Sequence, residues 1–281
     1  MIRRIAVLGA GTMGHGIAHA AVAAGYETQL FDVSADALES GRAAIETIVG
    51  KGVDLGKISA AEADAMVRRL HTTTSLAAAL DECDLVIEAA PERLDVKIAL
   101  LADVDRLVSD RAIVATNTSA LSITELAGST TVPARVAGMH FFNPVHKMKL
   151  VEIVQALDSA PATLDAIDRV AKQMGKETVL VRESPGFITT RVNASIGNEA
   201  FYMLMEGVAS ARDIDKALKL GLNHPMGPFE LVDLVGLDTR LSILEYLHRS
   251  LGEKYRPCPL LSQYVKAGRL GRKTGRGIYD Y

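Results

Sequence analysis

The chain has 281 residues, of which 23% are charged and 48% hydrophobic, and these are ordinary values for globular proteins. With 31 lysine and arginine residues against 34 aspartate and glutamate residues, the net charge is −3, which argues against a nucleic-acid binder with a basic surface. The apolar runs are too short for a membrane span of about 18 residues, and the run after Arg3-Arg4 is too short for a secretory signal. Cys83 and Cys258 lie far apart and form neither a disulfide framework nor a metal motif, so we expect a reducing, cytoplasmic location.

The N-terminal residues predict a strand, a helix and a second strand. Residues 2–8 form an apolar run that ends in the segment GAGTMG, residues 9–14. A small-residue amphipathic stretch over 15–24 stops at Gly25, and residues 28–32 are typical of a strand. This order is that of a βαβ unit.

Residues 35–70 are helical in pattern, with a predicted break at Gly50-Lys51-Gly52. Ser59 and Glu62 have the spacing of a capping box, which restarts the helix. Buried-type strands and a helix over 93–108 then continue an α/β alternation; the strands are predicted at 84–89, 112–115, 136–141 and 150–154.

The pattern changes near Pro185-Gly186. From there onward the periodicity is helical and contains no convincing strand run. We therefore expect an α/β fold with two domains, about one per 150 residues. Residues 1–184 would form a Rossmann-type, doubly wound NAD-binding domain, and residues 185–281 an all-helical domain for substrate binding and dimerisation, with the substrate in the cleft between the two.

Gly9, Gly11 and Gly14 form the pattern G-x-G-x-x-G directly after a strand and before a helix. The first glycine allows a tight turn, the second lets the backbone approach a pyrophosphate, and the third permits close packing of helix on strand. The helix N-terminus, at Thr12 and Met13, offers unpaired N–H groups to phosphates. The alternative is an ordinary strand-to-helix turn, and flavin proteins share this opening.

Asp32 closes the second predicted strand, 23 residues after Gly9. A carboxylate there can accept hydrogen bonds from both ribose hydroxyls of an adenosine, and it would repel a 2′-phosphate. Because no arginine follows it, NAD is favoured over NADP as the cofactor.

His140 and Glu152 lie in two apolar strand segments. Burying an unpaired carboxylate costs several kcal/mol, so Glu152 needs a cationic or hydrogen-bonding partner, and a histidine at a neighbouring strand end can be that partner. Such a pair fixes the imidazole tautomer and stabilises the imidazolium that forms when the base takes a proton. A purely structural pair, or a glutamate that faces solvent on an edge strand, would give the same pattern.

Small polar residues follow two of the predicted strands. Asn117 and Ser119 come after the strand at 112–115, and Asn143 comes after His140. Loops at the carboxyl ends of parallel strands face the ligand crevice, where hydroxyl and amide groups can bind a carbonyl or a carboxamide. The same residues are also common in turns and helix caps.

Together these motifs resemble the L-3-hydroxyacyl-CoA dehydrogenase family, and within it the stand-alone 3-hydroxybutyryl-CoA dehydrogenase type. The resemblance covers essentially the whole chain. Beyond the glycines and Asp32, it rests on seven short motifs: EAAPE at 88–92, TNTS at 116–119, HFFNP at 140–144, MKLVE at 148–152, PGF at 185–187, PMGPFE at 225–230 and GRKTG at 271–275.

The resemblance implies a catalytic site in which His140 is the general base for the 3-hydroxyl group and Glu152 orients it. Ser119 would contact the substrate and the nicotinamide side, and Asn143 would place the nicotinamide. The resemblance also implies that Glu92, Lys97 and Lys273 lie near the cofactor; the weaker alternative is that these three are solvated helix or tail charges.

On the substrate side the chain departs from the family at Thr190, where an asparagine is common. Threonine still donates and accepts hydrogen bonds but is shorter, and Asn193 on the same helix face is a weaker candidate for that role. Lys51 and Lys57 would meet the phosphates of coenzyme A or carry solvated charges. His224 is interpreted as a loop residue.

The implied reaction is reversible oxidation of (S)-3-hydroxyacyl-CoA by NAD⁺, with short acyl chains favoured by analogy. We expect a homodimer formed through the C-terminal domain, for instance by 196–205, and no metal, because His15 and His19 have no acidic third ligand. Two alternatives are a two-domain NAD dehydrogenase for a non-CoA hydroxy acid and a non-catalytic dinucleotide-binding protein. A third, the dehydrogenase part of a fused hydratase–dehydrogenase, is disfavoured because the chain is expected to be complete.

Overall fold

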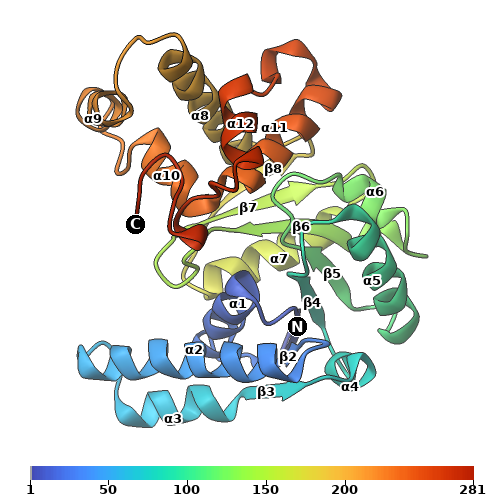
Figure 1. Ribbon diagram of the computed structural model, residues 1–281. Helices are drawn as coiled ribbons and strands as arrows, with labels where there is room; N and C mark the ends of the chain where they lie inside the picture. The colour runs from blue at the N-terminus through green and yellow to red at the C-terminus, as the bar shows by residue number, and fades with distance from the viewer. Residues whose placement is uncertain (1) are drawn as a thin grey trace. The chain divides into compact units, whose positions relative to one another are not determined.

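The computed structural model describes residues 2–281, which divide into a first unit that ends at Glu183 and a second from Ser184 to Tyr281. The first unit alternates strands and helices (Figure 1). In chain order its elements are β1 (Arg4–Leu8), α1 (Thr12–Ala23), β2 (Glu27–Phe31), α2 (Ala35–Asp54), α3 (Ala60–Arg68), β3 (Leu70–Thr73), α4 (Leu76–Leu80), β4 (Leu85–Glu88), α5 (Leu94–Leu107), β5 (Ile113–Thr116), α6 (Ile123–Ala127), the 3-10 turn Pro133–Arg135, β6 (Val136–Phe141), β7 (Leu150–Gln155), α7 (Pro161–Gln173) and β8 (Glu177–Arg182).

The strands of this unit form one sheet in the order β3-β2-β1-β4-β5-β6-β7-β8. The first six are mutually parallel in the order of a doubly wound dinucleotide-binding sheet, β7 is antiparallel to β6, and β8 is parallel to β7. This confirms the predicted Rossmann-type fold.

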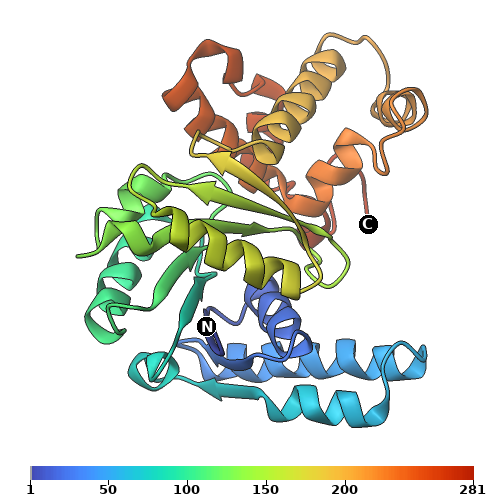
Figure 2. The same cartoon turned by 180° about the vertical axis from the view of Figure 1, so that it is seen from behind.

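Helices cover both faces of the sheet. Ile5 and Val7 of β1 pack with α1, α2 and α7 in one core, whereas Ala6 and Leu8, equally buried, point to the opposite face. Figures 1 and 2 show α4, α5 and α6 together on that opposite side. Because both faces are covered, central strands such as β4 and β6 are buried along their whole length, which explains their continuous apolar runs.

Three local predictions differ from the structure. The break expected at Gly50–Gly52 is wrong, because α2 continues to Asp54 and Gly56 forms the turn with a φ of +64°. Interior glycines cost only about 1 kcal/mol each in a helix, and the buried side chains of Ile45 and Val49 anchor α2 on the core. Strand β3 was not predicted, because it begins at the end of the stretch over 35–70 that was predicted to be helical. Strand β8 was not predicted either. The Ser59–Glu62 capping box is confirmed.

The second unit is helical. Its elements are α8 (Thr189–Met205), α9 (Ala211–Gly221), α10 (Pro228–Val235), α11 (Leu237–Leu251), the 3-10 turn Glu253–Tyr255, α12 (Pro259–Lys266) and the 3-10 turn Arg272–Thr274. Phe201, Phe229 and Leu244 lie in its core. Among the described residues of this unit, β pairing is limited to isolated bridges near Gly271 and Arg276, so the predicted all-helical C-terminal region is confirmed. None of the helices in residues 2–281 has the length and apolar character needed to cross a membrane.

Candidate active site

The turn between β1 and α1 has the geometry of a dinucleotide-binding turn. Gly9 has a φ of +106°, and a Cβ built there would lie 2.7 Å from the carbonyl oxygen of Ala89. A Cβ on Gly14 would lie 1.6 Å from the carbonyl oxygen of Gly9. At Gly11, by contrast, none of the described residues places an atom within 4 Å of such a Cβ. The first and third glycines are therefore required by the fold itself, and the second leaves its backbone open to a ligand.

Helix α1 begins at Thr12 directly after this turn. Gly11 is its N-cap, and within residues 2–281 no side chain caps its first turn and no acidic residue lies in that turn. The N–H groups at Thr12 and Met13 are thus available to an anion at the positive end of the helix dipole. This donor arrangement fits the pyrophosphate of NAD.

Asp32 lies half-buried just past the end of β2. One carboxylate oxygen accepts a hydrogen bond from the backbone N–H of Ala10 at 2.8 Å, and the other accepts one from Ser34 at 3.0 Å. The side chain therefore connects the glycine turn to the residues after β2 and places a negative charge beside that turn. An anionic group at this position fits NAD better than a 2′-phosphorylated cofactor.

His140 and Glu152 are partners across two paired strands. They are directly opposite each other in the antiparallel β6–β7 pair, and the Nδ1 atom of His140 lies 2.7 Å from the Oε2 atom of Glu152. Both side chains are buried, Glu152 completely. Strand register accounts for this contact, because opposed residues of an antiparallel pair bring their Cβ atoms within about 5.5 Å. An imidazole held in this way has a defined orientation and a negative partner for its protonated form.

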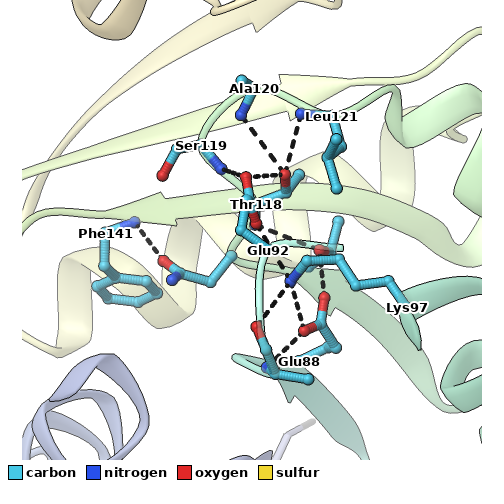
Figure 3. Close-up of polar contacts among 11 residues, drawn as sticks. Glu88, Glu92, Lys97, Thr118, Ser119, Ala120, Leu121 and Phe141 are labelled. Atoms are coloured by element: carbon cyan, nitrogen blue, oxygen red, sulfur yellow. Dashed lines mark hydrogen bonds and ion pairs between the residues drawn. The ribbon is translucent and has the colours of Figure 1, made fainter. Parts of the chain in front are cut away.

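Two neighbours restrain the strand end that carries His140. The aromatic ring of Phe142 lies 4.4 Å from the imidazole, measured between ring centroids. The backbone N–H of Phe141 donates to the Oδ1 atom of Asn117 at 2.8 Å. Asn117, predicted as a ligand-facing or turn residue, thus connects the loop after β5 to the end of β6; Figure 3 labels its partner Phe141.

The carboxylate of Glu92 holds the segment after β5 in place. Its Oε1 atom accepts hydrogen bonds from the hydroxyl of Thr118 at 2.6 Å and from the backbone N–H of Ser119 at 2.7 Å. The Thr118 hydroxyl in turn accepts from the N–H of Leu121 at 3.0 Å. In Figure 3 the side chain of Ser119 points away from Glu92, so the two predicted residues are linked through the backbone of Ser119.

Lys97 extends from α5 into the interior of the unit. Its Nζ atom lies 2.6 Å from Glu88, 3.1 Å from the carbonyl oxygen of Ala90 and 3.4 Å from Glu92. The Lys97 and Glu88 side chains are only 1% and 0% exposed, so this is a buried ion pair. The structure thus brings Glu92, Lys97 and Ser119 into one network in the first unit. Whether Glu92 and Lys97 bind the cofactor stays a prediction.

The remaining predicted residues lie elsewhere. In the first unit, Asn143 is exposed in the loop between β6 and β7, Lys51 is exposed near the C-terminal end of α2, and Lys57 is exposed in the turn before α3. In the second unit, Thr190 is half-buried in the first turn of α8. The Nζ atom of Lys273, also in the second unit, pairs with Asp238 at 2.6 Å.

Three residues of the network were given no role from the sequence. Glu88 accepts hydrogen bonds from the hydroxyl of Thr116 and from the backbone N–H of Ala90, both at 2.6 Å, in addition to its pair with Lys97. Thr116 and Thr118 carry the connection into the loop after β5. The available signal was the carboxylate itself, because Glu88 ends the apolar run Leu85–Ile87 and a buried carboxylate requires a partner.

Residues 2–281 contain no group of three or more histidine, cysteine, aspartate or glutamate side chains arranged to hold a metal ion. The glycine turn, the open N-terminus of α1 and Asp32, together with a buried His–Glu pair on the same sheet, define the class: a dehydrogenase with a Rossmann-type domain for NAD.

Comparisons with known proteins give the family. The model of the 3-hydroxyacyl-CoA dehydrogenase NAD binding domain matches residues 4–184, and that of the 3-hydroxyacyl-CoA dehydrogenase C-terminal domain matches residues 186–281. A probable 3-hydroxybutyryl-CoA dehydrogenase of Bacillus subtilis is 46% identical over 281 residues, which are 100% of this chain and 98% of that protein. A 3-hydroxybutyryl-CoA dehydrogenase of Bradyrhizobium diazoefficiens is 45% identical, over 100% of this chain and 96% of that one.

Solved structures agree with these matches. The crystal structure of an (S)-3-hydroxybutyryl-CoA dehydrogenase from Ralstonia eutropha has a TM-score of 0.96 and 42% identity, and covers 100% of this chain and 99% of that one. The chain belongs to the 3-hydroxyacyl-CoA dehydrogenase family and is an NAD-dependent oxidoreductase. The resemblance inferred from its motifs is therefore confirmed.

Proposed function

We propose that this chain catalyses the reversible oxidation of short-chain (S)-3-hydroxyacyl-CoA, with 3-hydroxybutyryl-CoA as the favoured substrate, and that His140 is its general acid and base. NAD-dependent oxidation of a 3-hydroxyacyl-CoA to the 3-oxoacyl-CoA is the reaction of its family. The 2.7 Å contact between buried His140 and Glu152 is the observation that carries the proposed mechanism. The preference for a four-carbon acyl group is supported by the names of the relatives that align over the whole chain.

In this mechanism NAD⁺, when bound, supplies the hydride acceptor. Glu152 accepts the hydrogen bond from Nδ1–H of His140, so that Nε2 is the nitrogen that takes the proton of the 3-hydroxyl group. The resulting imidazolium keeps the proton and is stabilised by the carboxylate; in the reverse direction it returns the proton to the carbonyl oxygen. A positioned acid–base group of this kind contributes about 10²–10⁴-fold to the rate.

The other predicted residues take binding roles in this proposal. The Ser119 hydroxyl and the Asn143 amide bind near the reacting carbon and the carboxamide, and Thr190 donates to the substrate. Exposed Lys51 and Lys57 suit the phosphates of coenzyme A, because an exposed ammonium pays little desolvation to bind an anion.

We further propose that the chain forms a homodimer through its C-terminal unit and works in the cytoplasm. The supporting observation for the dimer is a set of exposed apolar side chains in that unit: Val192, Met205, Val208, Leu220 and Leu222. The middle of α8, at Ala200 and Phe201, is buried within its own unit. Both cysteines are free thiols, in keeping with a reducing compartment. Light scattering on the purified chain and cell fractionation test these two points.

The decisive experiment follows NADH absorbance with acetoacetyl-CoA, with longer 3-oxoacyl-CoA compounds, with a free 3-oxo acid that lacks coenzyme A, and with NADPH in place of NADH. We expect the highest kcat/KM for acetoacetyl-CoA with NADH. The variant His140→Gln should lose most of this activity, whereas His71→Gln, at an exposed histidine of β3, should retain it. Near-normal turnover by His140→Gln would overturn the assignment of the base.

A further inference from the structure

Glu88 is a fully buried carboxylate that the acid–base pair does not use. It ends β4, and each of its oxygens has a partner: Oε1 accepts from Lys97 and from the N–H of Ala90, and Oε2 accepts from the hydroxyl of Thr116. Its backbone carbonyl accepts from the N–H of Asn117 at 2.8 Å. Glu88 therefore contacts the last residue of β5 through its side chain and the first residue after β5 through its backbone (Figure 3).

The ammonium group of Lys97 is surrounded by acceptors of the protein itself. A lysine ammonium has three N–H donors, and here it is enclosed with three acceptors: the carboxylates of Glu88 and Glu92 and the carbonyl oxygen of Ala90. Of the two carboxylates, that of Glu92 reaches the surface, with 42% of its side chain exposed, whereas that of Glu88 is fully buried. Lys97 thus acts on its surroundings through Glu92.

Glu92 connects the buried pair of Glu88 and Lys97 to the residues of the predicted site. The same carboxylate that faces Lys97 accepts from the Thr118 hydroxyl and from the Ser119 N–H, and one residue earlier Asn117 accepts from the N–H next to His140. A single segment of three residues, 117–119, therefore connects the buried ion pair both to Ser119 and to the end of β6.

We propose that Glu88 is a positioning residue: by anchoring Lys97 and Thr116 it fixes Glu92 and the segment 117–119, and so sets the place of Ser119 relative to the end of β6. This inference rests on the proposed function, in which Ser119 and His140 meet the substrate. Lys97 has the same positioning role.

The negative charge of Glu88 is needed to keep Glu92 and the segment 117–119 in place. In Glu88→Gln the side chain keeps its size, but Lys97 is left with Glu92 as its only carboxylate partner. A buried ammonium attracts the remaining carboxylate more strongly. Glu92 then moves toward Lys97, and its hydrogen bonds to Thr118 and Ser119 weaken.

The test compares four variants with the wild type: Glu88→Gln, Lys97→Met, the double variant with both changes, and Asp105→Asn as a control. Asp105 and Arg135 form another buried ion pair of the first unit, 6% exposed on each side, at the opposite end of α5. Thermal melting, kcat and KM for acetoacetyl-CoA with NADH, and hydrogen exchange of the 117–121 backbone are measured for each, at a temperature where all are folded.

Each single change in a buried pair should lower Tm by roughly 10 °C, because it leaves a buried charge without its partner. The double variant removes both charges and should regain most of this loss. The kcat of the double variant should nonetheless stay about 10- to 100-fold below that of the wild type, because a binding group is misplaced. Hydrogen exchange of the 117–121 backbone should also be faster than in the wild type. Asp105→Asn should have a lower Tm, but its kcat and its hydrogen exchange at 117–121 should match those of the wild type.

Recovery of both Tm and kcat in the double variant would overturn the positioning role, since the pair would then serve folding alone. A wild type that fails to turn over acetoacetyl-CoA would refute the proposed function instead. The exchange measurement still decides the present inference in that case: unchanged exchange at 117–121 in Glu88→Gln overturns it, and faster exchange there but not in Asp105→Asn supports it.

Discussion

Replacing Glu152 by glutamine removes the charge from the buried pair while keeping the shape of the side chain. The carboxylate is completely buried, and its Oε2 atom lies 2.7 Å from the Nδ1 atom of His140. A glutamine oxygen can still accept this hydrogen bond, so the orientation of the imidazole survives. What disappears is the extra stabilisation of the imidazolium that the proposed mechanism forms during oxidation.

The size of the effect follows from the kind of hydrogen bond that is lost. Hydrogen bonds to a charged group contribute about 1.5–3 kcal/mol and neutral ones about 0.5–1.5 kcal/mol. The difference of about 1–2 kcal/mol, if it is lost only in the transition state, lowers kcat by roughly 5- to 30-fold. Folding should be affected little, because a buried charge is replaced by a neutral amide of similar size.

The assay measures kcat for 3-hydroxybutyryl-CoA oxidation together with thermal melting. Glu177→Gln is the matched control, because Glu177 is an exposed glutamate at the start of the neighbouring strand β8. A Glu152→Gln enzyme with wild-type kcat would refute the electrostatic role of the pair. Loss of kcat only in proportion to loss of folded protein would refute it as well.

Three further predictions concern the first unit. Gly11→Ala should fold normally but bind NAD at least about tenfold more weakly, whereas Gly14→Ala should fold poorly, because its Cβ would stand 1.6 Å from a backbone oxygen; calorimetry and NAD titration separate the two. Asp32→Asn should weaken NAD binding and narrow the preference over NADP, which parallel titrations measure. Burial, and then the charge of His146, lowers the pKa of His19 from 6.5 to about 4. The unfolded chain therefore gains a proton before the folded one, so stability should fall by about 2–3 kcal/mol as pH drops from 6.5 to 4. His19→Gln should remove this part of the acid sensitivity in urea unfolding at several pH values.

The parts of the fold that were predictable are those that short segments determine. The glycine turn and the Ser59 capping box depend on residues within a few positions of one another, and the structure contains both. The contact between His140 and Glu152 was expected for a physical reason: each polar side chain interrupts an apolar strand, and a buried carboxylate needs a partner. Whether this contact is catalytic stays a prediction.

The parts that were missed depend on tertiary packing. The glycines at 50 and 52 suggested a helix break, yet α2 continues because Ile45 and Val49 are anchored in the core. Strand β8 has exposed residues in most of its positions, so its pattern resembles that of a loop. Lys97 was predicted to lie near the cofactor, which stays a prediction, but its pairing with Glu88 was not predicted. Only the placement of α5 against the end of β4 shows that its ammonium is enclosed by Glu88.

Two fully buried carboxylates of the first unit, Glu88 and Glu152, differ in the partner that each has. The proposed mechanism moves no proton to or from Lys97, so the pair that Lys97 forms with Glu88 can fix a geometry but does not change during the reaction. In the proposed mechanism the imidazole of His140 gains and returns a proton, so the electrostatic stabilisation from Glu152 changes with each step. The two pairs should therefore respond differently to pH. Loss of Glu152 should change the pH dependence of kcat, because the imidazolium is no longer stabilised. Loss of Glu88 should lower kcat by the same factor at every pH at which the protein remains folded.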